Sequence, residues 1–105
     1  MIKDIAKGMI FMHSLKPPFM HRDLKSLNVL IQNKVKGPED EILCKIADFG
    51  LTRQIEESSN YTSALAGTFH WMAPEVLENN KYSTAADVYS FGIVVWEILA
   101  REPPY

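Results

Sequence analysis

Two short polar segments carry the side chains best suited to chemistry. Residues 21–28 read HRDLKSLN and supply Asp23, Lys25 and Asn28, and Asp48 opens a later Asp-Phe-Gly segment. Carboxylate and amide oxygens are hard ligands of the kind that Mg²⁺ takes beside phosphates, and a further carboxylate can orient a hydroxyl and accept its proton. A lysine nearby would stabilise negative charge on a phosphoryl group. The two segments therefore predict a site for magnesium-bound phosphates and a hydroxyl nucleophile.

Each of these residues also has a plainer explanation when it is taken alone. Asn28 and Asp48 could cap turns, Asp23 could accept hydrogen bonds from a local turn, and Lys25 could be an ordinary exposed lysine. The histidines and the cysteine do not stand at spacings typical of zinc ligands, so a zinc site is not expected. The three histidines are interpreted as structural residues: His13, His21 and His70.

The N-terminal half of the chain shows one helical pattern and two strand patterns. Residues 1–13 have apolar side chains at helical spacing, which predicts an amphipathic helix, and two prolines end it. Apolar runs at 28–31 and 42–46 predict two strands, and the polar segment 32–41 between them predicts a surface hairpin loop. The apolar positions of the predicted helix are Ile2, Ile5, Ala6, Met9 and Ile10.

The C-terminal half is expected to contain a mobile loop and two helices. Polar residues dominate 51–66, a proline suits the first turn of a short helix over about 74–78, and a longer helix is predicted over about 84–100. Thr84 and Asp87 stand at capping-box spacing at its start. The longer helix is apolar nearly all round, which predicts burial on every side, and we expect the chain to be a piece of a larger fold that covers it.

Composition indicates one modest globular domain. The chain has 105 residues, 47% hydrophobic and 23% charged, and its net charge of −2 gives no reason to expect a nucleic-acid partner. The longest apolar run is too short for a membrane segment, and no secretory signal is visible. A single cysteine, Cys44, excludes an internal disulfide and is interpreted as an inert buried thiol. We therefore expect an intracellular, cytoplasmic protein.

The order of the motifs resembles the catalytic half of a eukaryotic protein kinase. After HRDLKSLN come ADFG at 47–50, GTFHWMAPE at 67–75 and DVYSFGIVVWE at 87–97. The resemblance extends from Met1 to Tyr105. It implies an α+β fold, namely the mainly helical large lobe of a protein-kinase-like fold with a short two-stranded β-hairpin.

The resemblance also implies how this partial kinase domain is divided. The catalytic loop would occupy 21–28, the activation segment 48–75 and the central helix about 84–100 of the single domain 1–105. The small nucleotide-binding lobe and the C-terminal helices of the large lobe would be absent, so the fold would be incomplete and the isolated chain would be inactive.

Roles for five residues follow from the resemblance. Asp23 would orient the attacking hydroxyl of a protein substrate, and Lys25 would lie near the transferred phosphoryl group. Asn28 and Asp48 would be the protein ligands of Mg²⁺ bound with ATP. Leu30 would form part of the apolar floor under adenine.

Supporting roles are implied for four further residues. Arg22 is typical of kinases whose activity depends on phosphorylation of the loop after Asp-Phe-Gly. Thr68 would bond the catalytic aspartate and lysine, and Asp87 would accept hydrogen bonds from the catalytic-loop backbone. Glu75 would pair with a downstream arginine that this chain lacks. The loop offers five candidate phosphorylation sites: Ser58, Ser59, Tyr61, Thr62 and Ser63.

Motif details favour one group within the family. Lys25 and Thr68 are similar to serine/threonine kinases, whereas WMAPE and FGIVVWE are similar to tyrosine kinases. This combination resembles the tyrosine-kinase-like group, which implies a signalling enzyme that transfers the ATP γ-phosphoryl group to serine and threonine hydroxyls of proteins. A pseudokinase-type binding or scaffold module and a protein-tyrosine kinase stay open as alternatives.

Overall fold

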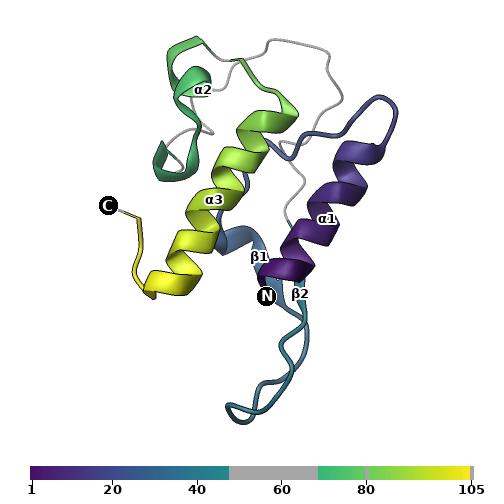
Figure 1. The fold of residues 1–105 in the computed structure, drawn as a ribbon, viewed down its shortest axis with the longest axis vertical. Coiled ribbons are helices and arrows are strands. Elements are labelled where there is room, and N and C mark those ends of the chain that lie inside the picture. The colour runs from purple at the N-terminus through teal and green to yellow at the C-terminus, as the bar shows by residue number, and fades with distance from the viewer. Residues whose placement is uncertain (48–68, 80, 105) are drawn as a thin grey trace.

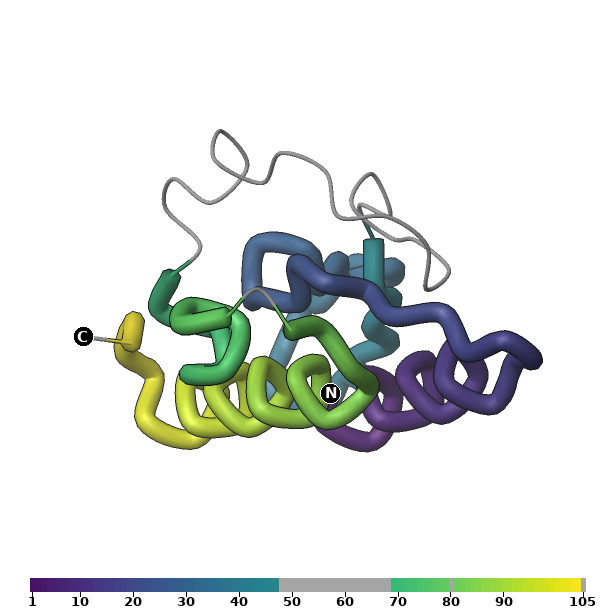
Figure 2. Tube along the Cα trace, turned by 90° about the horizontal axis from the view of Figure 1, so that it is seen from above, coloured from purple at the N-terminus to yellow at the C-terminus, as the bar shows by residue number. Residues whose placement is uncertain are grey.

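The computed structural model describes residues 1–47, 69–79 and 81–104, which form three α-helices, two 3₁₀ turns (Ser26–Asn28 and Phe69–Trp71) and one two-stranded sheet. Figure 1 shows α1 and α3 side by side, with the hairpin beside α1. The view from above in Figure 2 shows these two helices in one layer and the segment after α1 lying over it. In chain order the elements are α1 (Ile2–Ser14), β1 (Val29–Ile31), β2 (Cys44–Ile46), α2 (Pro74–Asn79) and α3 (Thr84–Ala100).

Helix α1 packs through one apolar face, as its spacing predicts. Ile5, Met9 and Met12 are buried in the main core, where they recur every three or four residues. The assignment of Ile10 to the apolar face was wrong, because its side chain is 65% exposed. Consecutive residues are about 100° apart around a helix, so Ile10, which follows Met9, points away from the buried stripe.

The hairpin agrees with the sequence prediction, although both strands are shorter than expected. Strands β1 and β2 pair antiparallel, with Val29 opposite Ile46 and Ile31 opposite Cys44. The connection between the strands is closed by its own polar groups. Asn33 Nδ2 donates to the Glu41 carbonyl oxygen, and Asn33 Oδ1 accepts from the Leu43 N–H at 2.8 Å. This segment is a surface hairpin loop.

The two C-terminal helices have the predicted extents, but the predicted capping box at the start of α3 was wrong. Ser83 is the N-cap residue of α3, one position before Thr84, and no side chain caps the helix. The Asp87 carboxylate cannot turn back to the helix start because it accepts hydrogen bonds from another segment. The helix ends at Ala100, and the C-cap residue Arg101 has a left-handed φ of 59°.

Helix α3 is buried on one side only among the described residues, and the expectation that a larger fold covers its other sides stays a prediction. Val94 is 1% exposed and lies in the main core, whereas Val88, Trp96 and Leu99 are 54%, 47% and 72% exposed. The reason is that the described segments cover only one side of the helix layer (Figure 2). Within the described part of the chain, no helix is long and apolar enough to cross a membrane. The predicted loop over 51–66 lies outside the described residues.

Candidate active site

His21 fixes the entry to the polar segment 21–28. Its ring is fully buried, and Nε2 lies 2.8 Å from the Ala47 carbonyl oxygen. Nδ1 accepts from the Asp23 N–H at 3.2 Å, which assigns the proton to Nε2. Both ring nitrogens thus bind backbone groups, which agrees with the interpretation of His21 as a structural residue. The ring links Asp23 to the residue that precedes Asp48.

Asp87 holds the same segment from α3. Its carboxylate is 2% exposed and accepts from the backbone N–H of His21 at 2.7 Å and of Arg22 at 3.0 Å. His13 Nε2 lies 2.9 Å from the Oδ2 atom of Asp87. The hydrogen bonds to the loop backbone are those that the resemblance implied. They support Arg22 in a left-handed conformation, with φ of 73°, which is unfavourable for a side chain of this size.

The segment then brings Asp23, Lys25 and Asn28 together. Asn28 is buried, and its Nδ2 atom donates to the Asp23 carbonyl oxygen at 2.7 Å and lies 3.4 Å from Asp23 Oδ2. Lys25 Nζ lies 3.7 Å from the same Oδ2 atom. A 3₁₀ turn over Ser26–Asn28 produces this arrangement by bringing the amide back toward the aspartate. The carboxylate therefore lies between a cation and an amide.

The orientation of Asn28 fits a role as a magnesium ligand. Because Nδ2 donates to Asp23, the Oδ1 atom faces the other way and offers the neutral hard oxygen that Mg²⁺ accepts. The second expected ligand, Asp48, lies outside the described residues. Within residues 1–47, 69–79 and 81–104, no three acidic, histidine or cysteine side chains form a metal-binding group. The described residues thus supply one half of the predicted donor pair.

Arg22 also contacts an aromatic ring. Its guanidinium carbon lies 4.4 Å from the centroid of the Tyr82 ring, within the range of cation–π attraction. Burial raises the pKa of the Tyr82 hydroxyl, and the nearby Arg22 charge opposes that effect. The guanidinium of Arg22 is therefore held beside the start of α3.

The remaining predicted residues are dispersed. Leu30 is on β1 and is 53% exposed. Glu75 is in the first turn of α2 and is exposed, so its carboxylate is not a buried charge that needs a partner. The predicted site residues outside the described part of the chain are Asp48, Thr68, Ser58, Ser59, Tyr61, Thr62 and Ser63.

Sequence reasoning missed a second polar group on α3. Ser26 Oγ donates to Glu97 Oε1 at 2.9 Å, and Trp71 Nε1 donates to Glu97 Oε2 at 2.8 Å. Ser90 Oγ donates to the Trp71 carbonyl oxygen at 2.6 Å. The available signal was Glu97 itself, the one charged residue after Asp87 in a helix that is otherwise rich in apolar residues. A carboxylate in such a place needs donors.

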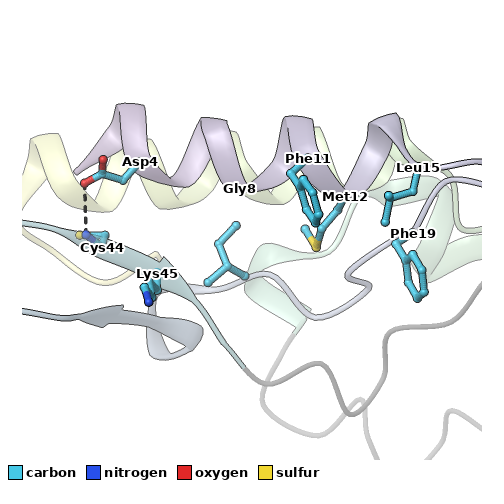
Figure 3. A pocket seen from close by; sticks show the side chains of 9 residues that line it. Asp4, Gly8, Phe11, Met12, Leu15, Phe19, Cys44 and Lys45 are labelled. Atoms are coloured by element: carbon cyan, nitrogen blue, oxygen red, sulfur yellow. Dashed lines mark hydrogen bonds between the residues drawn. The ribbon is translucent and has the colours of Figure 1, made fainter.

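A separate apolar pocket lies between α1 and β2, and it includes none of the predicted site residues. The pocket has a volume of about 470 Å³. Figure 3 shows Phe11, Met12 and Phe19 among the side chains that line it. At one end the Asp4 carboxylate accepts from the Cys44 N–H at 3.1 Å. Cys44 is buried and free, and burial raises the pKa of its thiol, which agrees with an unreactive side chain.

Comparison with known proteins identifies the family. A sequence model described as the protein kinase domain matches residues 1–105, the whole chain. The chain therefore belongs to the protein kinase family.

Individual relatives agree with this assignment. A probable serine/threonine-protein kinase of Dictyostelium discoideum is 45% identical over 99% of the chain, which spans 10% of that relative. The serine/threonine-protein kinase CTR1 of Arabidopsis thaliana is 41% identical over 100% of the chain and 12% of the relative. The dual specificity protein kinase splA of Dictyostelium discoideum is 43% identical over 96% of the chain, which spans 4% of that relative. The chain thus corresponds to an eighth or less of these curated relatives.

Proposed function

We propose that this chain carries part of the catalytic site of a protein serine/threonine kinase, which transfers the γ-phosphoryl group of ATP to hydroxyls of protein substrates in the cytoplasm. The observation that carries the proposal is the cluster of Asp23, Lys25 and Asn28. The Asp23 carboxylate lies 3.7 Å from the Lys25 nitrogen and 3.4 Å from Nδ2 of the buried Asn28 amide, which also donates to the Asp23 carbonyl oxygen. The kinase family of the chain supports the same chemistry.

Asp23 is the residue proposed to act on the substrate hydroxyl. Its carboxylate would accept a hydrogen bond from the hydroxyl, orient it for attack and finally take its proton. Lys25 contributes a positive charge beside this carboxylate, where it would offset negative charge on the transferred group. His21 and Asp87 hold the backbone that carries both residues, so the site is oriented before substrate binds.

ATP and Mg²⁺ are the proposed cofactors. Asn28 would bind the metal through Oδ1, with Asp48 as a second ligand, and Leu30 would contact the adenine. Bound metal would neutralise charge on the phosphates. The part of this chain is to fix the amide oxygen, which the hydrogen bond from Nδ2 to Asp23 does.

Preference for serine and threonine rests on Lys25 and on the relatives. Two of the three relatives described above are named serine/threonine kinases, and the third is named a dual specificity kinase. Transfer by the full-length protein should therefore be measured on matched peptides that carry serine, threonine or tyrosine. We expect Lys25→Ala to lower transfer to the serine and threonine peptides. An unchanged rate would remove the argument from Lys25.

The decisive test of the proposed function is Asp23→Asn in the full-length protein. We expect phosphoryl transfer to fall by about 10²–10⁴, the range for a positioned acid–base group. Glu39→Gln is the matched control, because Glu39 is an exposed acid in the hairpin loop. If wild-type protein transfers no phosphoryl group to any of the peptides, the scaffold alternative gains support. Retained activity in the Asp23 variant would refute the assigned role.

A further inference from the structure

One face of α3 carries three polar side chains that bind other segments. Asp87, Ser90 and Glu97 are separated by three and seven residues, so they lie along the same face of the helix. Asp87 and Ser90 are buried, and Glu97 is half-buried. Asp87 accepts from backbone groups of one segment, 21–22, and contacts the side chain of His13. Glu97 differs because its two carboxylate oxygens bind side chains from two segments that are far apart in sequence.

We propose that Glu97 is a positioning residue for phosphoryl transfer, acting by holding the loop 21–28 and the segment 69–73 to the same carboxylate. The inference rests on the proposed function, since it concerns the residues that carry that chemistry. Ser26 follows Lys25 directly and begins the turn that ends at Asn28. The bond from Ser26 to Glu97 therefore fixes the loop between its proposed cation and its proposed metal ligand.

The chemistry of the three side chains explains why a carboxylate occupies this position. The indole N–H of Trp71 can only donate, so the side chain facing it must accept, and the Ser26 hydroxyl, which can donate or accept, donates to Glu97. Glu97 accepts both bonds with one oxygen for each donor, at 2.9 Å and 2.8 Å. Hydrogen bonds to an ionised acceptor are stronger than neutral ones, particularly away from bulk water.

Trp71 is held at two points, which makes it a firm partner. Its side chain is buried, its indole binds Glu97, and its carbonyl oxygen accepts from Ser90. Segment 69–73 is therefore attached to α3 through both backbone and side chain. Because Ser26 and Trp71 both bind Glu97, the positions of the loop 21–28 and of the segment 69–73 depend on each other.

The test compares two substitutions of Glu97 in the full-length protein. Leucine keeps the size but removes both acceptors, and we expect kcat to fall by about ten- to a hundredfold from misplaced catalytic groups. KM for ATP should stay within about threefold, because the lost interaction acts on the reacting geometry rather than on nucleotide affinity. Glutamine can accept from Trp71 and donate to the Ser26 oxygen, so Glu97→Gln should restore kcat to within about threefold of wild type.

Controls separate positioning from simple loss of stability. Glu102→Gln and Glu102→Leu are matched variants at an exposed glutamate beyond α3, and both should leave kcat unchanged. The midpoint of thermal unfolding is measured for every variant. If Glu97→Leu keeps kcat within threefold of wild type while folded, or if Glu97→Gln is as impaired as Glu97→Leu, the proposal is overturned.

Single-contact variants decide the matter should Glu97→Leu not fold. Ser26→Ala and Trp71→Phe each remove one donor, and their effects on kcat should be coupled because they share one carboxylate. Effects that simply multiply in the double variant would overturn the proposal. Wild-type protein without transfer activity would overturn the proposed function and the role of Glu97 together. If wild-type protein is active and Glu97→Leu leaves kcat unchanged, only the role of Glu97 is overturned and the proposed function stands.

Discussion

Helices α1 and α3 lie in one layer and share one apolar core, yet they differ in the polar side chains that they bury. Helix α1 buries apolar side chains, among them Ile5 and Met9. Helix α3 buries Ala86 and Val94 together with the polar side chains Asp87 and Ser90, and it exposes large apolar side chains such as Leu99. An amphipathic helix normally follows the first arrangement. The second arrangement indicates that α3 serves as a support for other segments.

The difference follows from the cost of burying polar groups. A buried carboxylate or hydroxyl is tolerated when hydrogen bonds replace the water that it loses. Asp87 and Ser90 receive those partners from the segments 21–28 and 69–73. Helix α1 depends instead on packed apolar volume, which many side chains can supply. Replacing a polar residue by alanine should therefore lower stability strongly on α3 and only slightly on α1.

The largest effect is expected at Asp87. Asp87→Ala leaves the N–H groups of His21 and Arg22 without their buried acceptor, so we expect the free energy of unfolding to fall by about 3–5 kcal/mol. Urea denaturation of the full-length protein measures this. The matched variant on α1 is Asp4→Ala, which removes one hydrogen bond to the Cys44 N–H and should cost about 1 kcal/mol. Equal losses would break the contrast between the helices.

Apolar truncation tests the other half of the comparison. Ile5 is fully buried on α1, and we expect Ile5→Ala to lower the free energy of unfolding by about 2–4 kcal/mol through lost packing and a cavity. Ile10→Ala is the control on the same helix, and its exposed side chain predicts a change of about 0.5 kcal/mol or less. Calorimetry or urea denaturation separates the two. A large loss at Ile10 would contradict the assigned face of α1.

Two serines sharpen the comparison at a smaller scale. Ser90 and Ser14 both bond the carbonyl oxygen four residues earlier in their own helices, but Ser90 is buried and also binds the Trp71 carbonyl oxygen. We expect Ser90→Ala to cost about 1–2 kcal/mol because a buried acceptor loses its donor. Ser14→Ala at the exposed end of α1 should change stability by less than about 0.5 kcal/mol. Similar values would show that burial does not decide the cost.

The smallest effect concerns pH and Cys44. Burial raises the pKa of this thiol above its ordinary value of 9.0, so the folded protein keeps a proton that the unfolded chain loses. The stabilising contribution is present below pH 9 and is lost as pH rises through the raised pKa. We expect Cys44→Ala to flatten this decline in urea midpoints as pH rises above 9. The raised pKa of Tyr82 also makes stability fall with pH, but at higher pH than Cys44. Because Tyr82 is present in both wild type and the Cys44→Ala variant, its effect cancels in the comparison.

Local patterns in the sequence predicted most elements, and the failed capping box at α3 involves distant partners. The period of apolar residues found α1, and Pro74 found the start of α2, because both signals act within a few residues. The capping box failed because Asp87 binds backbone groups more than sixty positions away. Spacing alone could not show that preference.

The candidate site divides in the same way. The motif at 21–28 was sufficient to select Asp23, Lys25 and Asn28, and the structure places these residues in one cluster. Glu97 was missed because its partners, Ser26 and Trp71, come from segments with no shared motif. The exposed side of α3 in this chain was not located for a related reason, since hydrophobicity does not reveal which side of a helix the described segments cover.

The closed base of the hairpin loop has a consequence for how this protein can vary. Asn33 ties the two arms together beyond the last strand pair, with the backbone bond from the Gln32 N–H to the Leu43 carbonyl oxygen beside it. The loop residues between Asn33 and Glu41 are therefore held at their base by local hydrogen bonds. Residues could be inserted or deleted at the tip without transmitting a shift to Asp23, because loop closure becomes only slowly more costly with length. The tip is therefore where related chains can differ in length, and where a reporter peptide can be inserted.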